Sequence, residues 1–110
     1  MNILNKVIGA LTLKQIIGKK QFNQEILSQL EHEEKEELAD TSDIPEYVRE
    51  LLWTTGDSIV QRNILSHSFG DSPFIEKAIN ADCEVLFYAL EDRVDLSEAH
   101  QLAVIQFMAN

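Results

Sequence analysis

Apolar residues recur at helical spacing through the second half of the chain, with polar stretches between them. Two columns of apolar positions can be aligned, and the second lies four residues after the first in each segment. The columns contain Tyr47, Ile75 and Ala99, and then Leu51, Ile79 and Ala103. Because residues four apart lie on the same side of an α-helix, this pattern predicts three helices that bury equivalent faces.

Aspartates mark where these three helices are expected to begin. Asp43-Ile-Pro-Glu46 and Asp95-Leu-Ser-Glu98 place a glutamate three residues after an aspartate, which is a capping-box pattern. Asp71-Ser-Pro-Phe74 keeps the aspartate and the proline but has no glutamate. The spacing therefore predicts Asp43, Asp71 and Asp95 as N-caps.

A second series of helices is expected between the members of the first. Asp57 and Asp82 are each followed three residues later by valine and then by an apolar pair, Ile64-Leu65 or Ala89-Leu90. We expect both aspartates to be N-caps and two short helices to make up each repeat. The apolar run VLFYAL at 85–90 is ambiguous between strand and helix by itself, and its register assigns it to a helix.

Residues 22–39 allow two interpretations. Phe22–Leu30 and Glu33–Ala39 would be two helices of a degenerate first repeat. Alternatively, Phe22, Ile26, Leu30 and Leu38 would lie on one long helix.

The first twenty residues combine an apolar stripe with lysines. The stripe consists of Ile3, Leu4, Val7, Ile8 and Leu11, and Lys6 and Lys14 lie off it. Such stripes usually face a core, so we expect a helical cap that closes one end of the fold. The alternative is a basic amphipathic segment lying on an anionic membrane surface, and Gly9 and Gly18 argue against one long rigid helix.

Length and composition indicate one soluble domain. The 110 residues are 45% hydrophobic and 25% charged, as in ordinary globular proteins. We divide the domain 1–110 into a basic apolar cap (1–20), an acidic degenerate repeat (21–42) and helical repeats (43–110). The longest early apolar run, Val7–Leu13, is much shorter than the ~20 residues of a membrane-spanning helix. We therefore expect no signal peptide and no membrane span.

Cysteine usage and charge restrict the function further. Cys83 is the single cysteine, so we expect no disulfide framework, no metal or other cofactor, and a cytoplasmic location. The net charge is −10, with +4 in residues 1–24 and −8 in residues 25–50. This balance disfavours nucleic-acid binding, which needs surplus lysine and arginine, and favours a basic protein partner.

The stretch from Asp57 to Leu90 resembles the leucine-rich-repeat-variant class of short, HEAT-like α-solenoids. Asp57, Val60, Arg62, Ile64-Leu65 and Pro73 match the aspartate, valine, arginine, apolar pair and helix-opening proline of that class. The second unit matches with Asp82, Val85 and Ala89-Leu90, without the arginine. The resemblance covers about residues 43–104. It implies an all-α fold, a short α-solenoid of about three two-helix repeats with helical caps and a protein-binding surface. Some relatives carry an iron–sulfur cluster on a cysteine motif, which this chain does not have.

Catalytic signatures are weak, and we expect a non-enzyme. His32 and His67 have no histidine partner four residues away, as a zinc-peptidase helix would require. Cys83 has no surrounding nucleophile motif, and the four glycines stand apart rather than in a phosphate-binding loop.

The dense acidic run EHEEKEELAD at 31–40 is the strongest binding feature. Glutamates four apart repel one another on a helix, so helix stability does not explain their density. Two functions from different classes follow: an immunity or antitoxin-type inhibitor that covers a basic, nuclease-like toxin, or a helical-repeat adaptor. The expected acidic contacts are Glu33, Glu34, Glu36, Glu37, Asp40, Asp43 and Glu46. The candidate aromatic anchors are Tyr47, Trp53 and Phe69, and Trp53 is equally well explained as a core residue.

Overall fold

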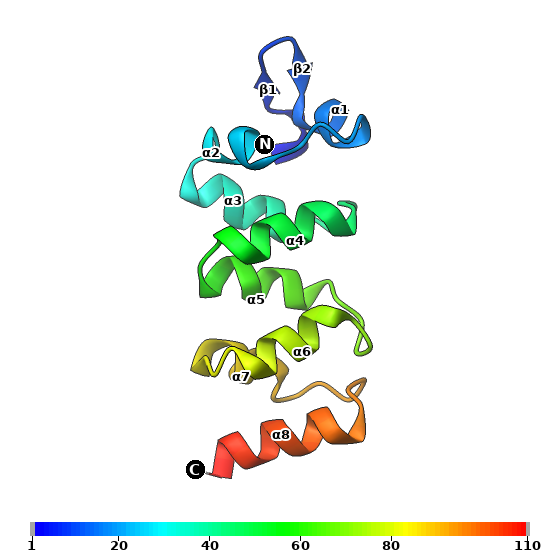
Figure 1. Ribbon diagram of the computed structural model, residues 1–110, viewed down its shortest axis with the longest axis vertical. Coiled ribbons are helices and arrows are strands. Elements are labelled where there is room, and N and C mark those ends of the chain that lie inside the picture. The colour runs from blue at the N-terminus through cyan, green and yellow to red at the C-terminus, as the bar shows by residue number, and fades with distance from the viewer. Residues whose placement is uncertain (1, 110) are drawn as a thin grey trace.

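The computed structural model describes residues 2–109 and is predominantly helical (Figure 1). The α-helices in that range are α1 (Leu13–Gly18), α2 (Gln24–Ser28), α3 (His32–Ala39), α4 (Glu46–Thr55), α5 (Ser58–Ser66), α6 (Pro73–Asn80), α7 (Glu84–Leu90) and α8 (Glu98–Ala109). A 3₁₀-helix, η1 (Ile3–Asn5), and an antiparallel pair of two-residue strands, β1 (Val7–Ile8) and β2 (Leu11–Thr12), precede them.

The helices follow one another along a molecule that measures 51 × 22 × 21 Å. The hairpin lies at one end and α8 at the other (Figure 1). Helix α5 packs against α3, α4, α6 and α7, and α8 packs against α6 and α7. Each helix therefore contacts mainly the helices near it in sequence.

One hydrophobic core runs the length of the molecule, from Ile3 to Val104. Its most buried large side chains include Leu52, Ile64 and Leu86, each no more than 1% exposed. Burial of one such side chain stabilises a fold by about 1.5–3 kcal/mol. The apolar columns supply only part of this core, because Ile75 is fully buried whereas Ala99 is exposed.

Two of the predicted helix starts are confirmed. The Asp57 carboxylate accepts hydrogen bonds from the backbone N–H groups of Ile59 and Val60, both at 3.1 Å, and so caps α5. Pro73 occupies the first turn of α6, where its missing N–H leaves no intrahelical bond unmade. The run at 85–90 lies in α7, as its register predicted.

The other four aspartates are not N-caps. Helix α4 begins at Glu46 behind Pro45, three residues after Asp43. The hydroxyl of Ser72 caps α6 in place of Asp71, and Cys83 holds the cap position of α7 in place of Asp82.

The Asp95 carboxylate forms an ion pair with Arg93 and does not cap α8. The Ser97 hydroxyl instead accepts a hydrogen bond from the His100 N–H. For α4, α6 and α7 a residue nearer the helix holds the cap position, and Asp95 has Arg93 as its partner instead.

Residues 22–39 form two helices, so the interpretation as one long helix is wrong. Helix α2 ends at Ser28, and the Leu30 N–H then bonds to the Leu27 carbonyl in a tight turn. Helix α3 begins at His32, where the Glu34 carboxylate accepts a bond from the Glu31 N–H.

The expected N-terminal helix is also wrong. Gly9 has a φ of +67° in the turn between β1 and β2, a conformation that glycine adopts without strain. Thr12 and Gln15 then form a capping box that starts α1. The apolar residues at 3–11 therefore belong to a 3₁₀ turn and a hairpin, and Val7 is 63% exposed. None of the helices within residues 2–109 has both the length and the apolar character needed to cross a membrane.

Candidate functional site

The acidic run forms α3, and one of its glutamates is engaged within the fold. The Glu34 carboxylate accepts a hydrogen bond from the Glu31 N–H and two from Lys6 Nζ, at 2.8 and 2.7 Å. These contacts hold the pKa of Glu34 below its ordinary value, with the bond from Glu31 as the largest cause. Glu34 thus ties the N-terminal segment to α3.

Two other glutamates of α3 remain available to a partner. Glu33 and Glu37 are exposed, and no ion pair of theirs occurs within residues 2–109; we name them the α3 face. Glu36 is half-buried, and its carboxylate lies 3.7 Å from His32 Nε2. Its backbone carbonyl accepts a hydrogen bond from Asn63 Nδ2 of α5.

The two expected aspartates lie in the loop that joins α3 to α4. Asp40 Oδ1 is 3.0 Å from His67 Nε2, so this carboxylate is paired with the residue that follows α5. Asp43 lines a pocket of about 520 Å³ together with Lys14, Lys20 and Tyr47. Here the acidic and basic parts of the chain meet, so Asp43 does not extend a purely acidic surface.

The two aromatic residues predicted as partner contacts are used inside the molecule. Trp53 is 8% exposed and packs its ring 5.4 Å from that of Phe74, so its interpretation as a core residue is confirmed. Tyr47 donates its hydroxyl proton to the Ile17 carbonyl at 2.9 Å, and burial raises its pKa. Trp53 is therefore unavailable as an anchor, and Tyr47 is half-buried with its hydroxyl already bonded within the fold.

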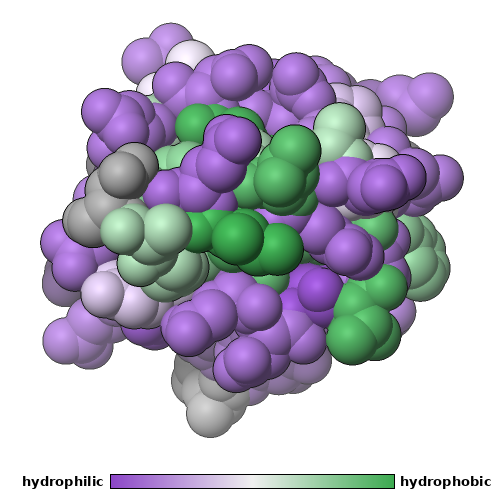
Figure 2. Space-filling view, turned by 90° about the horizontal axis from the view of Figure 1, so that it is seen from below, coloured by the Kyte–Doolittle hydropathy of each residue, from purple (hydrophilic) through white to green (hydrophobic). Residues whose placement is uncertain are grey.

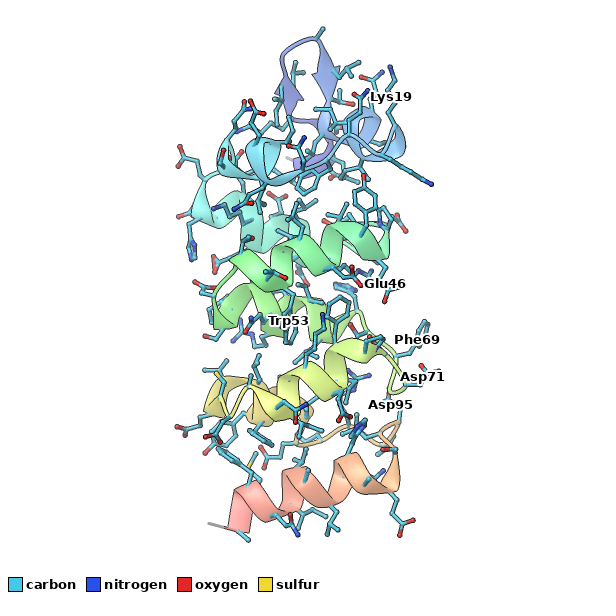
Figure 3. The ribbon with its side chains drawn as sticks, viewed as in Figure 1. Lys19, Glu46, Trp53, Phe69, Asp71 and Asp95 are labelled. Atoms are coloured by element: carbon cyan, nitrogen blue, oxygen red, sulfur yellow. The ribbon has the colours of Figure 1, made fainter. Side chains whose placement is uncertain are left out.

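Phe69, the third candidate anchor, is exposed. It is 81% exposed in the loop between α5 and α6. With Glu46 and Asp71 it lines a groove of about 300 Å³. The three side chains lie along the edge where α4 and α6 begin (Figure 3), and we name them the loop edge. Within residues 2–109 no ion pair involves Glu46 or Asp71.

Two arginines fix the loops of this edge. Arg49 donates to the carbonyls of Ser42 and His67, at 2.9 and 3.3 Å. Arg93 donates to the carbonyls of Leu65 and Ser68, at 2.8 and 2.6 Å. The two guanidinium groups thus supply donors to carbonyls at a helix end or in a loop, and the Leu65 carbonyl also accepts from the Ser68 N–H.

The Arg93 guanidinium also pairs with Asp95 and holds the pKa of that carboxylate below its usual range. Gly70 completes the contact between the two loops, because a Cβ atom at this position would lie 1.9 Å from the Asp95 carbonyl oxygen. The backbone of the Phe69 loop therefore rests directly on the loop before α8.

The three residues of the loop edge are predictable from the sequence to different extents. The sequence predicts Glu46 in the site, Phe69 as a candidate anchor and Asp71 only as a helix cap. The available signal was an aromatic residue in a Ser-Phe-Gly-Asp stretch, outside the apolar columns. Nothing in the local sequence signals the roles of Arg49 and Arg93, whose partners lie up to 28 residues away.

In the part of the chain that the structure describes, no three His, Cys, Asp or Glu side chains gather in an arrangement suited to a metal ion. No family model matches the chain, and neither a curated protein nor a solved structure shows significant similarity to it.

Proposed function

We propose that this chain is a protein-binding module that binds a basic partner protein through the loop edge. The partner that fits best is a nuclease-like toxin, which the chain would inhibit as an immunity or antitoxin-type protein. As part of this proposal, the two-helix units of residues 21–109 form a short α-solenoid. The elongated outline and the packing of α5 between α3 and α7 support that arrangement.

The observation that carries the proposal is the exposure of Phe69 beside the Glu46 and Asp71 carboxylates, which form no ion pair within residues 2–109. Arg49 lines the same groove, but its guanidinium donates to backbone carbonyls. Aromatic side chains are enriched among the residues that dominate binding energy at protein interfaces. Flanking carboxylates add specificity and speed association with a positively charged surface.

A net charge of −10 supports a partner whose own surface is strongly basic. Enzymes that cleave nucleic acids present lysine and arginine to the phosphate backbone. Carboxylates such as Glu46 and Asp71 can pair with the same lysines and arginines. The bound loop edge would therefore block access of the nucleic-acid substrate.

The adaptor function remains the second candidate. It is favoured by the presence of two separate acidic surfaces, because the α3 face and the loop edge are carried by different elements. An adaptor would hold a partner on each surface and would leave the activity of both unchanged.

Two charge-reversal variants of equal net charge test the binding surface. Partners are first captured from the native host with the wild-type chain and identified by mass spectrometry. Association is then measured for Glu46→Lys/Asp71→Lys and for Glu33→Lys/Glu37→Lys. Both variants change the net charge by the same amount, so they alter long-range attraction equally. We expect the loop-edge variant to slow association by about tenfold and the α3 variant to have a clearly smaller effect.

An equal loss in both variants would show that overall charge alone drives binding, and an unchanged rate for the loop-edge variant would exclude that surface. Inhibitor and adaptor are separated by the activity of the captured partner. The purified chain abolishes nuclease activity in the first case and leaves activity unchanged in the second.

A further inference from the structure

Helix α8 leaves an apolar face uncovered at one end of the stack. Leu102 and Ile105 are 54% and 62% exposed, and Val94 in the preceding loop is 92% exposed. Figure 2 views the molecule from this end, where apolar surface lies among polar surroundings. We name these three residues the end face.

The end face combines a ridge with a hollow. A groove of about 210 Å³ lies between α8 and the loop before it, and Leu90, Val94, Leu96, Val104 and Ile105 line its apolar part. Leu102 stands beside this groove, three residues before Ile105 on the same helix. Leu102 and Ile105 therefore form an exposed apolar ridge that can pack against the same ridge of a second copy.

The end face also differs from the rest of the chain in charge. Helix α8 contains no lysine or arginine, and Glu98 at its first position is its single carboxylate. The net charge of −10 of the whole chain opposes contact between two copies. At this end the groove beside α8 contains one carboxylate, Glu91, and one guanidinium, Arg93, so little net charge is present to attract a basic partner or to repel a second copy.

We propose that the end face binds a second copy of this chain, with the two α8 helices antiparallel about a twofold axis near Ile105. The seven residues between Glu98 and Ile105 span ~10 Å of helix, so the two Glu98 carboxylates lie ~20 Å apart. That separation exceeds the Debye length of ~8 Å at physiological ionic strength. In such a dimer the Leu102 and Ile105 side chains of the two copies meet at the centre of the contact.

The dimensions of the stack limit the strength of this dimer. An end with a cross-section of 22 × 21 Å offers roughly 450 Å² to a partner. Stable complexes of standard size bury about 800 Å² on each side. We therefore expect a reversible dimer with a dissociation constant in the micromolar range or weaker.

Salt dependence gives this dimer a signature of its own. Added salt screens the repulsion between two chains of charge −10 and should strengthen self-association. The same salt weakens the attraction between the loop edge and a basic partner. Salt thus changes the affinity of the two interactions in opposite directions. A result that contradicts one of them does not contradict the other.

The test is sedimentation velocity of the full chain from about 10 μM to 1 mM, at about 50 and 500 mM NaCl. We expect the mean mass to rise from monomer toward dimer with concentration, and to rise further at high salt. Small-angle X-ray scattering should show the radius of gyration increasing from 15.1 Å by about twofold, because the copies join end to end.

Lysine variants identify the surface. Leu102→Lys and Ile105→Lys should each weaken the dimer by at least about tenfold, because each places a charge in the apolar contact. Both make the chain less negative, so increased long-range repulsion cannot explain a loss. The matched control is Val7→Lys, which changes an equally exposed apolar residue at the opposite end, and circular dichroism confirms that each variant is folded.

Three results would overturn the proposal. The first is a wild-type chain that stays monomeric at all concentrations and both salt levels. The second is an equal loss of dimer in Val7→Lys. The third is a radius of gyration that rises only ~1.3-fold, which indicates copies lying side by side.

Discussion

The α3 face and the loop edge are both acidic, but they differ in what the fold leaves free. Helix α3 carries the densest run of glutamates, and yet Glu34 is bonded to Lys6 and to the start of its own helix. The loop edge has only Glu46 and Asp71, but these flank an aromatic side chain that is 81% exposed. The number of carboxylates in a stretch of sequence therefore does not show how many of them are free to bind a partner.

This difference follows from the two kinds of element. A helix that packs against α5 on one side can use its own carboxylates for capping and for ion pairs with neighbouring segments. A loop held through its backbone by Arg49 and Arg93 leaves its side chains free.

Trp53→Ala should have the largest effect on stability, because it removes a buried ring that packs on Phe74. We expect a loss of about 3–5 kcal/mol in the free energy of unfolding, measured by urea titration. Phe69→Ala should change that free energy by no more than about 0.5 kcal/mol, because the ring is exposed. Similar losses for the two variants would contradict the division into a core ring and a surface ring.

Phe69→Ala should instead weaken partner binding. We expect a loss of about 2 kcal/mol, or ~30-fold in the dissociation constant, measured by isothermal titration calorimetry with the captured partner. Tyr88→Ala is the matched control, because Tyr88 is also an exposed aromatic residue, at 55%, but lies on α7. Equal effects of both changes would remove Phe69 from the interface.

Arg93→Met should destabilise the fold because it removes the donor to the Ser68 carbonyl and one of the donors to the Leu65 carbonyl, which keeps the Ser68 N–H. We expect a loss of about 1–3 kcal/mol in chemical denaturation. Arg62→Met is the control, because Arg62 is exposed and makes no side-chain hydrogen bond or ion pair within residues 2–109. A loss as large for Arg62 would show that positive charge, rather than bonding to the loops, is what stabilises this region.

Glu34→Gln should lower stability by about 0.5–1 kcal/mol at neutral pH, since its partner Lys6 is only partly buried. Glu33→Gln, on the α3 face, should have no measurable effect. The comparison uses urea unfolding of both variants and the wild type at pH 7.

The Glu34 effect should also depend on pH. The pKa of Glu34 is lowered in the folded state, so its stabilising contribution is complete above the ordinary value of 4.5. It is lost as the pH falls through the lowered pKa. The difference between wild type and Glu34→Gln should therefore disappear in strongly acidic solution, and a difference that persists there would assign the effect to packing.

The helical content and the cap at Asp57 could be predicted because they depend on neighbouring residues. Asp82 has the same local pattern as Asp57, but it adopts a φ of +52° in the turn after α6 and leaves the cap position to Cys83. Similarly, the apolar spacing of Ile3–Leu11 suits a helix, but the turn at Gly9 and the capping box at Thr12 divide the segment.

The candidate site was less predictable because it is assembled across loops. Glu46 and Asp71 are 25 residues apart, and their shared groove depends on how α5 returns the chain to the same edge. The acidic run was prominent in the sequence, but its bond to Lys6 spans 28 residues and has no local signal. Periodicity reveals which residues share a helix face and gives no information on which distant loops meet.

The contact between Gly70 and the Asp95 carbonyl has a consequence for the entropy of binding. A flexible loop must be ordered when a partner arrives, at about 1–2 kcal/mol for each residue whose backbone becomes fixed. The Phe69 loop is already braced by this contact and by the arginine bonds. Binding therefore has to immobilise little more than the phenyl ring, at about 0.5–1.5 kcal/mol. A single exposed ring on a preorganised loop can thus contribute most of its contact energy to affinity.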